Sequence, residues 1–167
     1  MRVLGIDPGI ATTGYGLVRH EGNRHMAEDY GCILTSKHDE VPDRLDQLYR
    51  HLTTLFSQTK PDVLAIEKLF FGTNVTTAIV VGQARGIVLL VAQQHGVPVA
   101  EYTPPQVKGA VCGYGNAKKP QVQQMVQVLL KLASLPKPDD AADALAIALC
   151  HTNALTLPQA LGRGAGR

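Results

Sequence analysis

The chain has 167 residues, a mass of 17.9 kDa and a formal net charge of +2, with 16 basic against 14 acidic residues. This length suits one domain, and a content of 45% hydrophobic and 18% charged residues excludes a disordered or fibrous protein. The small net charge excludes binding of nucleic acid by bulk positive charge, so any DNA-binding surface must be a local basic patch.

The first part of the chain predicts three short strands joined by tight turns. Arg2–Asp7 is an apolar run that ends at a Pro-Gly pair, which breaks regular structure. Residues 14–18 and 26–34 follow as two further strands, with turn residues at 21–23 between them. Short strands joined by tight turns predict an antiparallel meander.

Beyond residue 40, helical and strand patterns alternate. The leucines of residues 43–57 share one helical face, whereas Val63–Glu67 is a short apolar run typical of a buried strand. The predicted helices are 43–57, Val75–Gln94, 104–111, 120–133 and 139–151, and the predicted strands are Val63–Glu67 and 97–101. Strands separated by helices pair in parallel through crossover connections. The sequence therefore predicts an α/β fold with a mixed five-stranded sheet, three antiparallel and then two parallel strands, flanked by helices.

One domain is expected over residues 1–153, followed by a flexible tail at 154–167 whose last ten residues are rich in Gly and Arg. The most apolar stretch, 78–92, is interrupted by Gln83 and Arg85. It is shorter than the roughly 20 apolar residues that a membrane span needs, so we expect no membrane association. Three cysteines without CxxC spacing suit a reducing, cytoplasmic location rather than a disulfide framework or structural zinc.

Two carboxylates stand at the carboxyl ends of predicted strands. Asp7 ends the first strand and Glu67 ends a later one. Either acid alone could be an exposed strand end. As a pair they indicate a ligand-binding site, because ligands bind at the carboxyl ends of parallel strands. A buried carboxylate also requires a group that compensates its charge.

A second pair of acids, Asp140 and Asp143, has the spacing that puts both carboxylates on one helix face. Asp139 could instead cap this helix, and acids in a first turn also favour the helix dipole. Four converging acids would bind Mg²⁺ or Mn²⁺, and two such ions form a clamp used in phosphodiester hydrolysis. With those four acids set aside, 16 basic and ten acidic residues carry +6, which allows a basic face around an acidic pocket.

Five sequence blocks resemble the RuvC family of Holliday-junction resolvases, which belongs to the ribonuclease H-like superfamily. The blocks are GIDPG at 5–9, TGYG at 13–16, AIE at 65–67, GQARG at 82–86 and DAADALA at 140–146. The resemblance covers about residues 1–153. It implies a ribonuclease H-like fold and assigns two divalent ions, Mg²⁺ or Mn²⁺, to Asp7, Glu67, Asp140 and Asp143. The extra Asp139 leaves open which acid of this motif holds metal, and the spacing to Asp143 favours Asp140.

The resemblance also implies how the protein meets DNA. It places Phe70 among bases at the centre of a four-way junction and Lys108 and Lys119 against phosphates. Without it, adjacent aromatics are ordinarily core residues and a lone Lys is a solvated charge. Lys118 and Lys119 do stand before a predicted helix, at a loop that contains Gly and Asn at 113–116, which is a suitable location for a phosphate. For Arg85, pairing with an acid and contact with DNA both remain open.

The resemblance implies an endonuclease that nicks two opposite strands of a four-way junction symmetrically. Two symmetric nicks imply a homodimer, for which Val75–Gln94 is the expected interface helix. The resemblance further implies association with a branch-migration motor complex of RuvA and RuvB. Two other classes of protein are alternatives. An ATP-binding domain of the actin and Hsp70 type shares a Gly-Ile-Asp-x-Gly motif but needs two domains. A catalytically inactive junction-binding module would lack one or more of the four acids, and all four are present.

Overall fold

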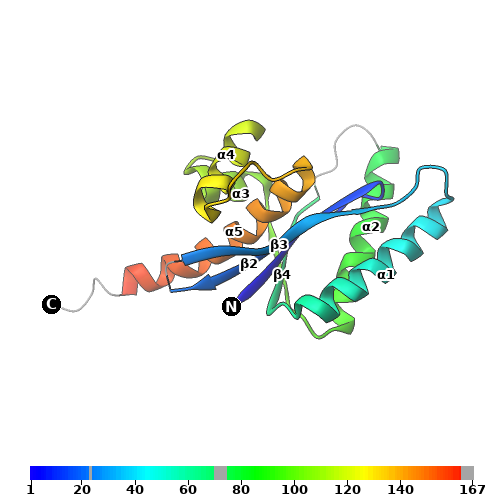
Figure 1. Cartoon of the computed structure of the whole chain (residues 1–167), viewed down its shortest axis with the longest axis horizontal. Helices are drawn as coiled ribbons and strands as arrows, with labels where there is room; N and C mark the ends of the chain where they lie inside the picture. Colours follow the sequence, from blue (N-terminus) through cyan, green and yellow to red (C-terminus); the bar gives the residue numbers. More distant parts are fainter. Residues whose placement is uncertain (23, 70–74, 163–167) are drawn as a thin grey trace.

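The computed structural model describes residues 1–22, 24–69 and 75–162, and within these ranges it contains five strands and five helices. In chain order they are β1 (Arg2–Asp7), β2 (Thr12–Glu21), β3 (Arg24–Leu34), α1 (Val41–Thr59), β4 (Val63–Glu67), α2 (Val75–Gln94), β5 (Val99–Tyr102), α3 (Pro104–Cys112), α4 (Lys119–Leu130) and α5 (Asp139–Gly162). The sheet forms the middle layer, with α1 and α2 on one face and α3, α4 and α5 on the other (Figure 1).

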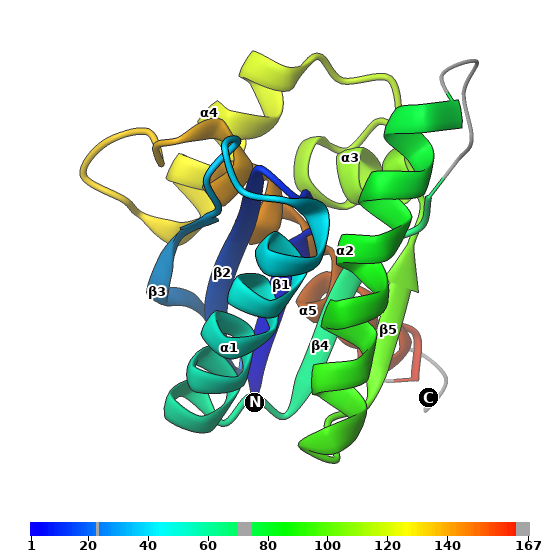
Figure 2. The ribbon, with the colours of Figure 1, turned by 90° about the vertical axis from the view of Figure 1, so that its right-hand side faces the viewer.

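The sheet has the strand order β3-β2-β1-β4-β5. β1 pairs antiparallel with β2, and β2 pairs antiparallel with β3, whereas the β1–β4 and β4–β5 pairs are parallel. Helices connect the parallel strands, and α1 and α2 lie side by side in front of the sheet in Figure 2. The predicted mixed sheet, with three antiparallel and then two parallel strands, is confirmed.

The alternation of side chains along β1 and β4 builds two cores from one sheet. Leu4 and Ile66, which are fully buried, belong to the core shared with α1 and α2. Val3 and Ala65, also fully buried, belong to the core shared with α3, α4 and α5. Because both faces are covered, β1 and β4 are apolar between their ends, and only Arg2 at the start of β1 and the last residue of each strand carry charge.

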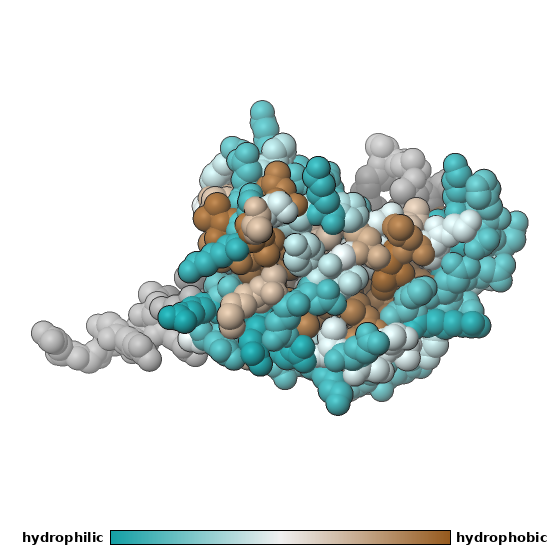
Figure 3. Space-filling view, viewed as in Figure 1, coloured by the Kyte–Doolittle hydropathy of each residue, from teal (hydrophilic) through white to brown (hydrophobic). Residues whose placement is uncertain are grey.

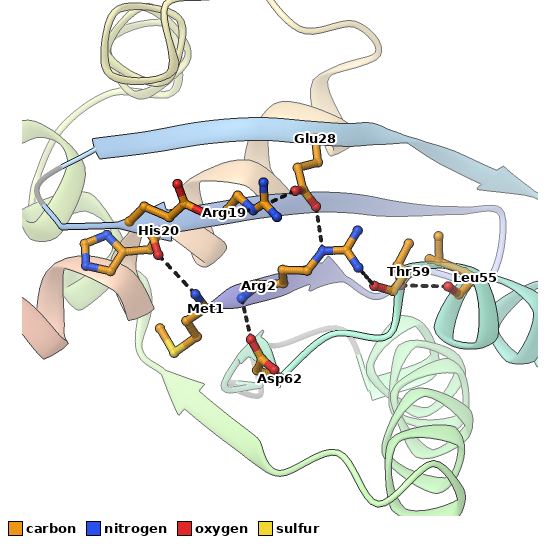
Figure 4. A network of polar contacts seen from close by, with 9 residues as sticks. Met1, Arg2, Arg19, His20, Glu28, Leu55, Thr59 and Asp62 are labelled. Carbon is orange, nitrogen blue, oxygen red and sulfur yellow. Dashed lines mark hydrogen bonds and ion pairs between the residues drawn. The ribbon is translucent and has the colours of Figure 1, made fainter.

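A polar network holds the opposite end of β1 from Asp7 (Figure 4). The amide of Arg2 donates to the Asp62 carboxylate at 2.7 Å, and its Nε donates to Glu28 at 2.6 Å. The Arg2 guanidinium group also donates to the main-chain oxygen of Thr59 at the end of α1. The start of β1 is thus bonded to β3, to α1 and to the turn before β4. These contacts fix the direction of the strand, and therefore the position of Asp7 at its end.

Several elements are longer than the sequence predicts. β2 extends to Glu21 because its polar end still pairs with β3, with Glu21 opposite Arg24. The last helix was expected to end at 151, but helical backbone continues to Gly162. Asn153 anchors this next turn by donating from Nδ2 to the main-chain oxygen of Ala110 on α3 at 2.9 Å. The flexibility expected of 154–167 stays a prediction, although helix covers the segment up to Gly162.

Hydrophobic side chains also reach the surface. On the face shown in Figure 3 they gather in separate patches bordered by hydrophilic side chains. The most exposed large hydrophobic residues of the described ranges are Leu34 at the end of β3, Val128 on α4 and Ile79 on α2. No helix in those ranges combines the length and the apolar character needed to cross a membrane.

Candidate active site

Asp7 and Glu67 end neighbouring parallel strands. Ile6 of β1 pairs with Ile66 of β4, so the next residue of each strand emerges at the same edge of the sheet. Both acids are partly buried, unlike the fully buried residues that precede them. The register of two parallel strands therefore brings together two carboxylates that are 60 positions apart in the sequence.

The helix α5 brings Asp140 and Asp143 to this edge because glycines let it lie directly on the sheet. A Cβ atom at Gly5 would overlap the main-chain oxygen of Ala144, and one at Gly14 would overlap that of Asp140. Gly14 is the residue opposite Asp7 in the β1–β2 pair. The close approach of α5 to the sheet at Gly14 therefore lies beside both Asp7 and Asp140.

Three of the four acids line one cleft with a volume of about 320 Å³. Asp7, Glu67 and Asp143 share it with Lys108 of α3 and Lys119 of α4. The remaining wall is formed by apolar residues and a proline, namely Pro104, Val107, Val122, Ala146 and Ile147. Sequence reasoning missed this apolar wall, since these residues show only the ordinary periodicity of buried helix faces.

Asp140 lies differently from the other three acids. It lines another hollow with residues 9–11 of the β1–β2 turn, with Thr12 at the start of β2, and with Val80 and Val81 of α2. Its negative charge nevertheless acts on Asp7, whose pKa it helps to raise. Asp139 is exposed and does not contribute to that shift. Of the two adjacent acids, Asp140 is therefore the one that belongs to the electrostatic surroundings of the cleft.

The acids of the cleft oppose one another's ionisation. Burial raises the pKa of Asp7 from its ordinary value of 3.8 to about 7, with further contributions from the negative charges of Asp143, Glu67 and Asp140. Lys119 acts in the opposite direction. The pKa of Glu67 is raised by burial and by Asp143, and lowered by Lys108. The cleft thus holds more negative charge than its own lysines balance.

Lys119 supplies the nearest positive charge. Its Nζ lies 2.9 Å from Oδ2 of Asp143 and 3.7 Å from Oδ2 of Asp139. The hydrogen bond to Asp143 raises the pKa of Lys119. The ammonium group is half exposed, so it can leave Asp143 for another anion without a large desolvation penalty.

The donor set fits a hard divalent cation. The acidic groups offer only carboxylate oxygens, which Mg²⁺ and Mn²⁺ prefer, and the raised pKa of Asp7 reflects repulsion that a cation would relieve. As the side chains stand, no three acidic, histidine or cysteine residues of the described ranges surround one point in a way that could hold a metal ion. The side chains of the cleft would have to turn inward to chelate one, with Lys119 displaced from Asp143.

Two further sequence predictions concern Phe70 and Arg85. Phe70 lies outside the described residues, and its predicted contact with bases stays a prediction. Arg85, for which two roles were open, pairs with an acid: its guanidinium group contacts the carboxylate of Glu101. It also donates from Nη1 to the main-chain oxygen of Glu67 at 2.8 Å, a contact that no sequence signal revealed.

This fold and cleft define a class of protein. A mixed sheet of this order, with acids at the ends of β1 and β4 and on a helix packed across them, is that of a ribonuclease H-like nuclease. The family model for crossover junction endodeoxyribonuclease RuvC matches residues 3–151, and the chain belongs to this family. Family membership implies dependence on a divalent metal.

Individual relatives agree with this assignment. The chain is 54% identical over 162 residues to the crossover junction endodeoxyribonuclease RuvC of Desulfitobacterium hafniense, covering 97% of this chain and 98% of the relative. The structure of Thermus thermophilus RuvC superposes with a TM-score of 0.87 at 37% identity, covering 95% and 97% of the two chains. T. thermophilus RuvC in complex with a Holliday junction substrate gives 0.86 at 35% identity, covering 94% and 96%.

Proposed function

We propose that this protein resolves Holliday junctions by symmetric paired nicks, in homologous recombination and DNA repair. The observation that carries the proposal is the convergence of Asp7, Glu67 and Asp143, from three separate elements, on one cleft that also contains two lysines. The complex of the T. thermophilus relative with a Holliday junction supports the choice of substrate.

The proposed roles follow from the chemistry of the cleft. Asp7, Glu67, Asp140 and Asp143 would hold two divalent ions, Mg²⁺ or Mn²⁺. When bound, such ions supply Lewis acidity for the attack of water on the scissile phosphate and for the departure of the 3′ oxygen. Cleavage in this direction leaves a 5′-phosphate and a 3′-hydroxyl.

Basic and aromatic residues would hold the DNA. Lys108 and Lys119 would offer ammonium groups to phosphates near the scissile bond, and the hydrogen bond from Lys119 to Asp143 would be exchanged for one to DNA. Phe70 would stack on a base at the junction centre, a contact that contributes about 1–3 kcal/mol for aromatic residues in general.

Paired nicks require two active sites related by a two-fold axis, and we propose that α2 forms the homodimer interface. The inner face of α2 is buried through Ala84, Val88 and Val91. Its outer face exposes Ile79 and Leu90, which are 57% and 48% exposed. Between them, Gly82 and Gly86 have no atoms near the position of a Cβ, so a second helix could approach the backbone closely.

The proposed setting is the bacterial cytoplasm, in association with a branch-migration motor complex of RuvA and RuvB. Family membership supports both parts of this proposal. The free thiols of Cys32, Cys112 and Cys150 suit a reducing compartment.

Cleavage of a synthetic four-way junction with Mg²⁺ or Mn²⁺ tests the proposal. The wild type should cut two opposite strands, and Asp7→Asn should bind the junction without cutting it. Equal cleavage by both proteins would overturn the assignment of Asp7. Hydrolysis of ATP in the absence of DNA would instead favour the ATP-binding class.

A further inference from the structure

Arg85 stands out as a charged residue on the inward side of an apolar helix. It neighbours the fully buried Ala84, and its side chain is only 11% exposed. Nη1 donates to the main-chain oxygen of Glu67 at 2.8 Å, and Nη2 pairs with the carboxylate of Glu101 on β5. Because Nη1 and Nη2 both have protein acceptors and the side chain is largely buried, Arg85 has little capacity left for a contact with DNA.

The peptide group that follows Glu67 is held from two directions. The amide of Lys68 donates to the main-chain oxygen of Tyr102 at 2.7 Å, so β5 holds the N–H side. Arg85 holds the C=O side from α2. This peptide is the point at which β4 leaves the sheet, where the pairing of β4 with β1, which ends at Ile66, no longer constrains the chain.

We propose that Arg85 is a positioning residue, which fixes the main chain at Glu67 and thereby aims the Glu67 carboxylate into the cleft. Rotation of the peptide after Glu67 would swing its Cα–Cβ bond and move the carboxylate away from Asp7 and Asp143. Glu101 orients the guanidinium group, in the way that outer partners orient metal ligands elsewhere. The inference rests on the proposed role of Glu67 as a metal-binding acid.

Binding of Mn²⁺ to the full-length protein without DNA, measured by the electron paramagnetic resonance of free Mn²⁺, tests this proposal apart from activity. Arg85→Gln removes the charged donor and should weaken Mn²⁺ binding about 10- to 100-fold, as is typical when an outer partner of a ligand is lost. Arg85→Lys keeps one donor for the Glu67 oxygen and should recover part of the affinity. Glu101→Gln keeps an acceptor oxygen for Arg85 and should stay within about threefold of wild type.

A second readout separates positioning from general damage. In single-turnover cleavage of a four-way junction, Arg85→Gln should raise the Mg²⁺ concentration for half-maximal rate by about 10- to 100-fold. Its affinity for the junction in EDTA should stay within about twofold of wild type, because the DNA-binding surface is intact. Arg50→Gln removes an exposed arginine from an ion pair with Asp46 on α1, and it serves as the matched control that changes neither quantity.

Wild-type Mn²⁺ affinity in folded Arg85→Gln would overturn the proposal, as would equal losses of metal and junction affinity. If Arg85→Gln does not fold, Arg85→Lys tests the proposal instead. Unchanged Mn²⁺ affinity in Arg85→Lys would contradict it, because lysine cannot contact both the Glu67 oxygen and Glu101 as the guanidinium group does. Failure of the wild type to cut the junction would refute the proposed function. The comparison of Mn²⁺ affinities would still decide the role of Arg85.

Discussion

The ammonium group of Lys119 lies 2.9 Å from the carboxylate of Asp143, in the cleft where Asp7 and Glu67 also lie. In the absence of a bound cation, Lys119 is therefore the group that balances part of the negative charge contributed by α5. The same lysine is proposed to contact a phosphate of the DNA. Lys119 cannot keep its hydrogen bond to Asp143 and at the same time bind a phosphate equally strongly.

Replacing Lys119 by Met separates these two partners. We expect Lys119→Met to lower the single-turnover cleavage rate about 10- to 100-fold, as for loss of a hydrogen bond to a charged group. We also expect Mg²⁺ to raise the melting temperature of the variant more than that of the wild type, because repulsion among the acids is no longer balanced. Lys131→Met removes the same charge at the other end of α4 and should leave both quantities near wild type. A smaller thermal response to Mg²⁺ in Lys119→Met would contradict the explanation.

The contact between Gly14 and α5 predicts a strong effect of a single methyl group. A Cβ at Gly14 would overlap the main-chain oxygen of Asp140, so Gly14→Ala must push α5 away from the sheet. We expect a loss of about 3 kcal/mol in the free energy of unfolding, measured with urea, together with loss of cleavage. Gly109→Ala on α3 is the matched control. A Cβ at Gly109 meets no atoms, and the change should be neutral or stabilising by about 1 kcal/mol. Wild-type stability in Gly14→Ala would show that the helix does not rest on this residue.

The raised pKa of Asp7 predicts how the stability of the metal-free protein depends on pH. The folded-state pKa of about 7 lies above the ordinary value of 3.8, so the folded protein binds the proton more tightly than the unfolded chain. Ionisation of Asp7 therefore destabilises the metal-free fold increasingly from about pH 4 to pH 7, with the full penalty above pH 7. Asp7→Asn should raise the free energy of unfolding in EDTA at pH 8 by at most about 4 kcal/mol.

This gain should shrink as the pH falls toward 4, where Asp7 is protonated in both states. Asp46→Asn, a change at an exposed acid of α1, should show no such trend. Saturating Mg²⁺ should stabilise the wild type and have much less effect on Asp7→Asn. Lower stability of Asp7→Asn at pH 8 would mean that the Asp7 carboxylate has a stabilising partner in the metal-free fold.

The exposed face of α2 predicts a monomeric variant. A charge at the centre of a helix interface is desolvated without a partner, so Leu90→Glu should shift the protein from dimer to monomer in analytical ultracentrifugation. Junction cleavage should then give single nicks in place of paired ones. Val128→Glu places the same charge at a similarly apolar exposed position on α4 and should remain dimeric. A Leu90→Glu protein that stays dimeric would move the interface away from α2.

Local patterns in the sequence predicted most of the fold. The bounds of β1, β4 and α2 agree with those predicted. For the two strands this is because each is a buried apolar run that ends at an acidic residue, where the chain leaves the sheet. The polar outer half of β2 was missed, since its pairing with β3 rather than its own pattern makes it a strand. The continuation of α5 beyond residue 151 was missed, and the contact of Asn153 with α3, which lies in this continuation, has no local signal in the sequence.

The sequence predicted which residues form the site, but it did not predict all of their contacts. Strand ends and helix spacing indicated which carboxylates converge. They could not indicate that Asp140 lines its own hollow, or that the guanidinium group of Arg85 contacts Glu101 and the Glu67 main chain. Such contacts join residues from elements that are distant in the sequence, and they depend on how helices pack rather than on any local pattern.

The packing of α5 on the glycines of β1 and β2 has a consequence for the protein's opening motions. Ala144, Leu145 and Ala148 are fully buried, so the helix that carries Asp140 and Asp143 belongs to the part of the molecule with the greatest protection against local opening. The amide hydrogens of its buried middle, residues 144–149, should exchange with solvent only when the whole domain unfolds. Partial unfolding elsewhere in the molecule then leaves Asp140 and Asp143 packed against the sheet, and the two acids leave the cleft only when the whole fold is lost.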